Sequence, residues 1–265
     1  MTSRLPICFK HSRLSNPARL PSRARQQAVR HAYLLLALLP LASPAATVNG
    51  RVQIASAKTG RSMEGVAIWL VPTQGKAPTP GPQTVRVLQK GKRFSPHVSV
   101  IGVGSTVDWP NLDPIFHNAF SNFAGQPFDT GLYPPGGTQR TRFMREGVVR
   151  VFCNIHSSMS AVIVVSPTPW FTASGRDGTF SLDGVPPGEY TLKVWHERAP
   201  DGALRSAERR ITVTGDSAVT LDPIAIAETG FVQPPPHKNK YGLEYPPEPP
   251  ARAGYEQAPG SSRAK

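Results

Sequence analysis

A short segment near the middle of the chain carries three side chains of types that bind soft metal ions. Cys153, His156 and Met159 follow one another at three-residue steps, with an apolar run before them and a β-branched run after them. This pattern predicts a strand, a tight loop and a second strand, with the thiolate, the imidazole and the thioether on the loop. Such ligands favour soft or borderline metals, above all copper that cycles between two oxidation states.

A copper site of this type needs a second imidazole, which His117 in a separate segment can supply. Two His ligands, one Cys and a weak axial Met make the arrangement of a blue-copper electron-transfer centre. In such a site Cys153 binds as the thiolate, the imidazoles complete a trigonal plane, and a long bond to Met159 disturbs that plane little. A structural zinc site is the alternative, although it normally uses more Cys or His ligands and no Met.

The residues around these ligands resemble the small cupredoxins over roughly residues 83–166. The resemblance rests on Gly-Ser-Thr-Val-Asp-Trp-Pro-Asn at residues 104–111, on His-Asn at 117–118 and on the two-residue gaps within 153–159. Those gaps are most similar to amicyanin, because plastocyanins have a longer gap between the second His and the Met. The chain is also similar to cupredoxin-like periplasmic proteins that are often labelled methylamine utilization proteins.

The resemblance implies a single type 1 copper ion and a role for each residue that matches the family pattern. The implied metal ligands are His117, Cys153, His156 and Met159. Asn118 matches the residue that hydrogen-bonds toward the ligand loop. The electron would leave through the imidazole edge of His156, beneath a surface that includes residues 114–116. The implied partner is a periplasmic redox protein, either a dehydrogenase or a cytochrome c.

Composition predicts an all-β protein. The 265 residues include 29 prolines and 23 glycines with short Val-rich runs between them, which is typical of a β-sandwich whose turns separate short strands. We therefore expect a cupredoxin-like Greek-key β-sandwich at residues 83–166, inserted in or packed beside a second small β-sandwich.

The second sandwich is predicted from residues 167–228. They contain the pattern Asp-Gly-x-Phe-x-Leu-x-x-Val-Pro-Pro-Gly-x-Tyr-x-Leu, which resembles the carboxypeptidase regulatory-like, transthyretin-like β-sandwich. Such a domain normally opens with two strands of a kind found here at residues 47–80. We therefore predict a discontinuous sandwich that receives the cupredoxin domain as an insertion, since insertion at a loop tip is well tolerated. The alternative is that residues 47–72 pair with the cupredoxin sheet.

Residues 1–46 have the pattern of a signal peptide for export to the periplasm. Seven Lys or Arg and no acidic residue precede the apolar run Leu-Leu-Leu-Ala-Leu-Leu-Pro-Leu, and small residues follow it. An uncleaved membrane anchor is the alternative. Removal of this segment lowers the formal net charge from +13 to +6, a modest value that does not call for a nucleic-acid partner.

The cysteine count supports the ligand interpretation. Only two cysteines occur, and Cys8 lies in the segment that export would remove. Cys153 would then be alone in an oxidising compartment, where it cannot form an internal disulfide. A lone secreted cysteine is intermolecular, free or a ligand, and the neighbouring His and Met favour a ligand. A buried structural cysteine is the remaining alternative.

Residues 229–265 are rich in proline and poor in aliphatic residues, so we expect a disordered tail. Histidines outside the proposed site are expected to lie on a strand surface (His97), in a structural position (His196) and in the tail (His237). Met144 is expected in the core. Turns and strand ends account for the remaining acids, Asp108, Asp113 and Asp129.

The ligand pattern and the second sandwich are consistent with different classes of function. A periplasmic, non-enzymatic one-electron carrier with one type 1 copper ion explains the ligand pattern. A non-redox binding or scaffold module at the cell envelope, with a degenerate or metal-storing site, is the alternative that the second sandwich favours. A multicopper enzyme would need a trinuclear cluster, for which the five histidines after residue 46 are too few.

Overall fold

The computed structural model describes residues 45–55, 62–122, 125–215, 218–228 and 237–246. Within these ranges the chain is almost entirely β, with one short helix, α2 (Asp201–Ala207). The all-β prediction is therefore confirmed. The predicted signal peptide lies almost wholly outside the described residues, as does most of the predicted C-terminal tail.

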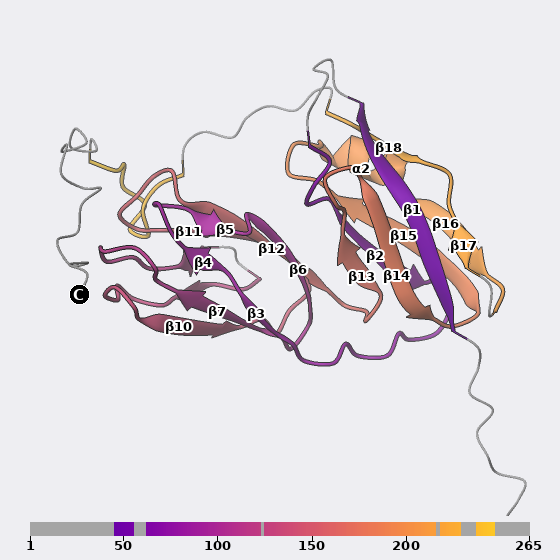
Figure 1. Cartoon of the computed structure of the whole chain (residues 1–265), viewed down its shortest axis with the longest axis horizontal. Coiled ribbons are helices and arrows are strands. Elements are labelled where there is room, and N and C mark those ends of the chain that lie inside the picture. The colour runs from indigo at the N-terminus through magenta and orange to yellow at the C-terminus, as the bar shows by residue number, and fades with distance from the viewer. Residues whose placement is uncertain (1–44, 56–61, 123–124, 216–217, 229–236, 247–265) are drawn as a thin grey trace, which may run out of the picture. The chain divides into compact units, whose positions relative to one another are not determined.

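The part of the chain that carries the predicted ligands forms a β-sandwich, which we call the ligand sandwich (Figure 1). Its strands are β3 (Thr84–Arg86), β4 (Leu88–Gln89), β5 (Phe94–Ser95), β6 (Val98–Gly102), β7 (Thr106–Pro110), β8 (Phe120–Ser121), β9 (Phe128–Asp129), β10 (Thr138–Arg142), β11 (Gly147–Phe152) and β12 (Ser160–Ser166). One sheet has the order β10-β7-β3, another has the order β6-β12-β11-β8-β9, and β4 and β5 form a hairpin. The chain passes repeatedly from one sheet to the other, so loops at the ends of the sandwich connect the two layers.

The core of the ligand sandwich is centred on Trp109. Its side chain is fully buried, its ring centroid lies 5.7 Å from Phe94 and 6.0 Å from Phe128, and its indole N–H donates to a threonine hydroxyl at 3.1 Å. Burial of such a ring contributes about 2 to 3 kcal/mol. Met144, which the sequence analysis placed in the core, is instead 54% exposed, because Phe143 fills the inward position next to it.

A second β-sandwich, the flanking sandwich, combines strands from both sides of the ligand sandwich in the sequence. Its strands are β1 (Ala46–Ala55), β2 (Ala67–Pro72), β13 (Phe171–Ala173), β14 (Thr179–Val185), β15 (Gly188–Trp195), β16 (Arg209–Val213), β17 (Val219–Thr220) and β18 (Ile224–Ala227). β1 pairs with β14, β17 and β18, and β2 pairs with β13 and β15. The ligand sandwich therefore lies between β2 and β13 in the sequence. The relation of the flanking sandwich to carboxypeptidase regulatory-like domains stays a prediction.

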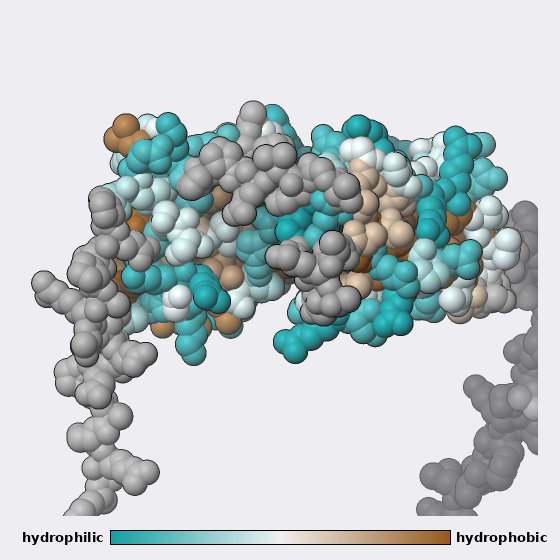
Figure 2. Space-filling model, turned by 90° about the horizontal axis from the view of Figure 1, so that it is seen from above, coloured by the Kyte–Doolittle hydropathy of each residue, from teal (hydrophilic) through white to brown (hydrophobic). Residues whose placement is uncertain are grey.

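The described residues include no helix that is long and apolar enough to cross a membrane. The face drawn in Figure 2 is mostly hydrophilic, with small apolar areas among the polar residues. Three exposed apolar side chains, Leu112, Phe116 and Ile155, are close in sequence to the predicted ligands.

The turn before β14 requires glycine. Gly178 has a φ of +85°, and a Cβ atom there would lie 2.2 Å from the carbonyl oxygen of Val52 on β1. We expect Gly178→Ala to lower the free energy of unfolding by roughly 3 kcal/mol, because it adds a collision with the backbone to left-handed strain. The matched control is Gly184→Ala, which has a φ of +70° and no atom within 4 Å of its Cβ position. The control should cost about 1 kcal/mol in urea unfolding, and equal losses in the two variants would contradict this account.

Candidate metal centre

The turn between β11 and β12 holds three of the four predicted ligands. Both strands are rich in β-branched residues, and their antiparallel pairing ends with Phe152 opposite Ser160. Two backbone hydrogen bonds close the turn: the Cys153 N–H donates to the carbonyl of Met159 at 3.2 Å, and the Met159 N–H donates to the carbonyl of His156 at 3.1 Å. One tight backbone loop therefore fixes all three side chains.

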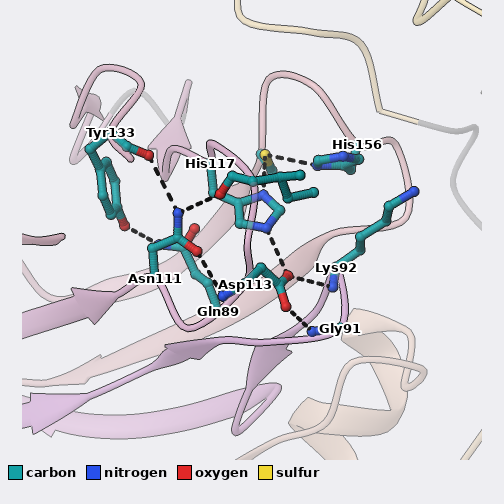
Figure 3. A network of polar contacts seen from close by, with 10 residues as sticks. Gln89, Gly91, Lys92, Asn111, Asp113, His117, Tyr133 and His156 are labelled. Carbon is teal, nitrogen blue, oxygen red and sulfur yellow. Dashed lines mark hydrogen bonds and ion pairs between the residues drawn. The ribbon is translucent and has the colours of Figure 1, made fainter. Parts of the chain in front are cut away.

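His117 comes from the segment between β7 and β8, which Asn111 organises. The buried Asn111 amide donates to the carbonyl of Ile115 at 2.7 Å, and its oxygen accepts the Asp113 N–H at 3.0 Å (Figure 3). The backbone of His117 pairs with Tyr133 through hydrogen bonds of 3.3 and 2.9 Å. The imidazole therefore projects from a segment that is held at several points.

The two segments bring three possible ligand atoms together. Nδ1 of His117 and Nδ1 of His156 each lie 3.8 Å from Sγ of Cys153, and all three atoms lie within 4.8 Å of one another. Figure 3 shows the sulfur atom next to both imidazoles. Cys153 and His117 are fully buried, whereas His156 is partly exposed. The group therefore has one side toward the core and one imidazole toward the surface.

Met159, the predicted axial ligand, is fully buried and belongs to the same core cluster as Cys153. Its carbonyl accepts the Cys153 N–H and its own N–H donates to the carbonyl of His156, so its backbone closes the ligand turn. Its part in metal binding stays a prediction.

The Asp113 carboxylate, which the sequence predicts only as part of a turn, holds His117 on the side away from the sulfur. Nε2 of His117 lies 2.8 Å from Oδ2 of Asp113, and both side chains are buried. When the Nε2–H group donates a hydrogen bond to the carboxylate, the lone pair of Nδ1 faces the sulfur and is available to a metal. The sequence signal for this contact is the spacing of Asp113 four residues before His117, and a simple turn explains that spacing equally well.

The hairpin turn between β4 and β5 binds the Asp113 carboxylate in turn. Gly91 and Lys92 have φ angles of 63° and 55°, as in a tight hairpin, and their N–H groups donate to the two carboxylate oxygens at 2.6 and 2.8 Å (Figure 3). Burial acts to raise the pKa of Asp113, but these N–H groups and His117 outweigh it, so the pKa lies below its ordinary value. The carboxylate therefore stays charged at neutral pH and keeps its hold on His117.

Asn118 joins the two ligand segments. Its side-chain oxygen accepts the Asn154 N–H at 2.7 Å, and its amide donates to Asp129 at 2.9 Å. Asn154 directly follows Cys153, so this hydrogen bond fixes the chain next to the sulfur.

Burial controls the protonation of Cys153. It raises the pKa of the thiol, and four backbone N–H groups from the two ligand segments only partly oppose the rise. Without a metal the sulfur is therefore a thiol at neutral pH. A bound cation would displace that proton, because the thiolate is the form that binds metal strongly.

The donor set fits copper better than the hard cations. One buried sulfur and two imidazole nitrogens suit copper or zinc, whereas magnesium and calcium prefer oxygen ligands. In the described part of the chain, His117, Cys153 and His156 are the side chains that lie close enough together to share one ion as a group of three. Met159 as a fourth donor would favour copper over a structural zinc.

No protein-family model matches the chain, and no curated protein matches it. Among solved structures, the chain is similar to a copper-containing nitrite reductase (NirK) from Thermus scotoductus SA-01, with 29% identity and a TM-score of 0.31 over 36% of this chain and 25% of the reductase. It is similar to a novel purple cupredoxin from Nitrosopumilus maritimus, with 26% identity and a TM-score of 0.29 over 31% of this chain and 99% of that one. A reduced mutant of amicyanin shares 18% identity, with a TM-score of 0.29 over 31% of this chain and 80% of that one.

We expect Asp113→Asn to weaken metal binding by roughly 10- to 100-fold. An asparagine offers one oxygen in place of two, so it cannot accept all three N–H groups that now bind the carboxylate, and His117 loses its fixed orientation. The matched control is Asp108→Asn, since Asp108 pairs with an arginine whose side chain is 72% exposed. Competition with a Cu(I) chelator measures the affinity, and equal affinities in the two variants would show that Asp113 has no part in the site.

The raised pKa of Cys153 gives a pH dependence. In the metal-free protein, the thiol should react slowly with an aromatic disulfide reagent at neutral pH, because little thiolate is present. The rate should keep rising above the pH at which ordinary thiols ionise, about 8.5. A pH–rate profile measures this, and a midpoint below that of free cysteine would contradict the effect of burial.

Proposed function

We propose that this protein is a periplasmic one-electron carrier with a single type 1 copper centre. The observation that carries the proposal is the meeting of one thiol and two imidazoles, from segments far apart in sequence, within 4.8 Å. A bound copper ion would supply a one-electron couple there, and this ligand set tolerates both of its oxidation states. The proposed ligands are His117, Cys153, His156 and Met159.

The task of the surrounding residues is to keep the ligands in place while the charge of the centre changes. Asp113 orients one imidazole, and Asn118 ties its segment to the chain next to the sulfur. The backbone hydrogen bonds of the ligand turn hold the remaining donors. Because these contacts do not involve the metal, the donor positions depend little on its oxidation state.

His156 is the proposed exit for the electron. It is partly exposed, and its neighbour Ile155 is 41% exposed, while Phe116 beside His117 is 52% exposed. An apolar area around the edge of a ligand suits a brief contact with a redox partner. The partner that we propose is a periplasmic dehydrogenase or a cytochrome c.

Two further parts of the proposal rest on the sequence. The basic and then apolar pattern of residues 1–46 supports export to the periplasm, where a lone cysteine can serve as a ligand. The small number of histidines after residue 46 supports a carrier rather than a multicopper enzyme.

The alternative is a non-redox binding or scaffold module at the cell envelope, with a degenerate or metal-storing site. The flanking sandwich favours this alternative, because a second β-sandwich can serve as an interaction scaffold. Metal preference and reversible redox chemistry separate the two functions.

Addition of Cu(II) to the protein without residues 1–46 should produce an intense visible absorption from thiolate-to-copper charge transfer. The band should bleach on reduction and return on oxidation, and Cys153→Ala should abolish it because the thiolate is removed. His97→Ala is the control, since His97 lies outside the ligand group and bonds Glu197 and the carbonyl of Ser160. A colourless protein, or one that prefers zinc, would favour the scaffold function instead.

A further inference from the structure

Residues 237–246 form a compact turn with hydrogen bonds of its own, which we call the C-terminal turn (yellow in Figure 1). Oδ1 of Asn239 accepts the N–H groups of Tyr241 and Leu243, each at 3.0 Å, and the Asn239 N–H donates to the carbonyl of Leu243 at 2.9 Å. Gly242 has a φ of +76°, which a glycine adopts without strain. Composition alone predicts a disordered tail over these residues, so the turn corrects that prediction.

Lys240 of the C-terminal turn binds the ligand sandwich at two points. Its Nζ lies 2.6 Å from Oδ2 of Asp129, and its backbone N–H donates to Oδ1 of Asn154 at 2.9 Å. Both of these partners also bond Asn118, the residue that joins the two ligand segments. Lys240, Asp129, Asn118 and Asn154 therefore form a closed ring of polar contacts, in which Asn154 is the residue that follows Cys153 in the sequence.

Tyr245 binds the backbone of Cys153, the residue that carries the proposed sulfur ligand. Its hydroxyl donates to the backbone carbonyl of Cys153 at 2.6 Å and lies 3.2 Å from Nδ1 of His237. Burial, and after it the nearby Cys153, raise the pKa of Tyr245, so the hydroxyl keeps the proton that it donates. The ring of His237 stacks on Phe152, with centroids 4.0 Å apart and 25° between the planes.

These contacts converge on three consecutive residues. His237 covers Phe152, Tyr245 binds Cys153, and Lys240 binds Asn154. Stacking, a hydrogen bond to a carbonyl and a backbone hydrogen bond next to an ion pair are contacts of different kinds. Together they restrain the backbone on both sides of the sulfur more than any one of them could.

We propose that the C-terminal turn is a positioning element of the metal centre, which fixes the Cys153 sulfur against the two imidazoles. The proposal rests on the proposed copper function and adds residues that lie up to 92 positions from Cys153 in the sequence. Loss of these contacts would let the backbone of residues 152–154 open locally. The sulfur would then be more accessible without metal, and less well aligned with bound copper.

Two substitutions in the full protein test the proposal in the metal-free state. Tyr245→Phe removes the hydrogen bond to the Cys153 carbonyl, and Lys240→Met removes the ion pair with Asp129. Each should speed the reaction of Cys153 with an aromatic disulfide reagent by roughly 2- to 10-fold. The reason is that the backbone of residues 152–154 opens more easily when it loses one stabilising contact. The matched control is Lys238→Met, because Lys238 pairs with Glu244 where both side chains are largely exposed. The control should keep the wild-type rate.

The copper-loaded proteins provide a second measurement. Tyr245→Phe and Lys240→Met should shift the thiolate-to-copper absorption and the reduction potential, whereas Lys238→Met should change neither. If the contacts are merely structural, the two variants should lower the unfolding temperature but keep the wild-type thiol rate, absorption and reduction potential. That result in both variants would overturn the proposal. A wild-type protein that never forms the copper band would refute the copper function, while the thiol rates would still decide whether the turn restrains Cys153.

Discussion

The rest of the candidate metal centre depends on the buried contact between His117 and Asp113. A fully buried imidazole needs a partner for its N–H, and Asp113 provides one on the nitrogen that faces away from the sulfur. The carboxylate is buried in turn, so it needs donors of its own, and the N–H groups of Gly91 and Lys92 supply them. The hairpin β4–β5 thus holds Asp113, Asp113 holds Nε2 of His117, and Nδ1 is the nitrogen left facing Cys153.

The two-layer architecture explains why such distant segments can meet. The chain alternates between the sheets of the ligand sandwich, and the segment with His117 runs from β7 in one sheet to β8 in the other. β8 pairs with β11 where Phe120 lies opposite Phe152, so His117 comes close to Cys153 at the end of β11. Asn118 and the N–H of Asn154 join the two segments. In the proposed function this rigidity keeps the donors in place through a redox cycle. The proposed restraint from the C-terminal turn acts on the same short stretch from outside the sandwich.

The sequence predicted those features that depend on local spacing. The strand–loop–strand pattern around Cys153 and the all-β class followed from β-branched runs, prolines and glycines. Asp113 was not predicted as part of the site, because its role depends on a hairpin turn that lies 21 or 22 positions earlier and on the fold that brings the two together. Composition likewise assigned residues 237–246 to a disordered tail. Low aliphatic content explains why this segment has no core of its own, but its contacts depend on the surface of another part of the chain.

The most direct test of the central claim is X-ray absorption at the copper edge of the loaded protein. The claim is that one sulfur and two imidazole nitrogens bind the same ion. It predicts one short copper–sulfur bond and two copper–imidazole bonds, with little change between the oxidised and the reduced protein. A spectrum of nitrogen and oxygen ligands with no bound sulfur would contradict it.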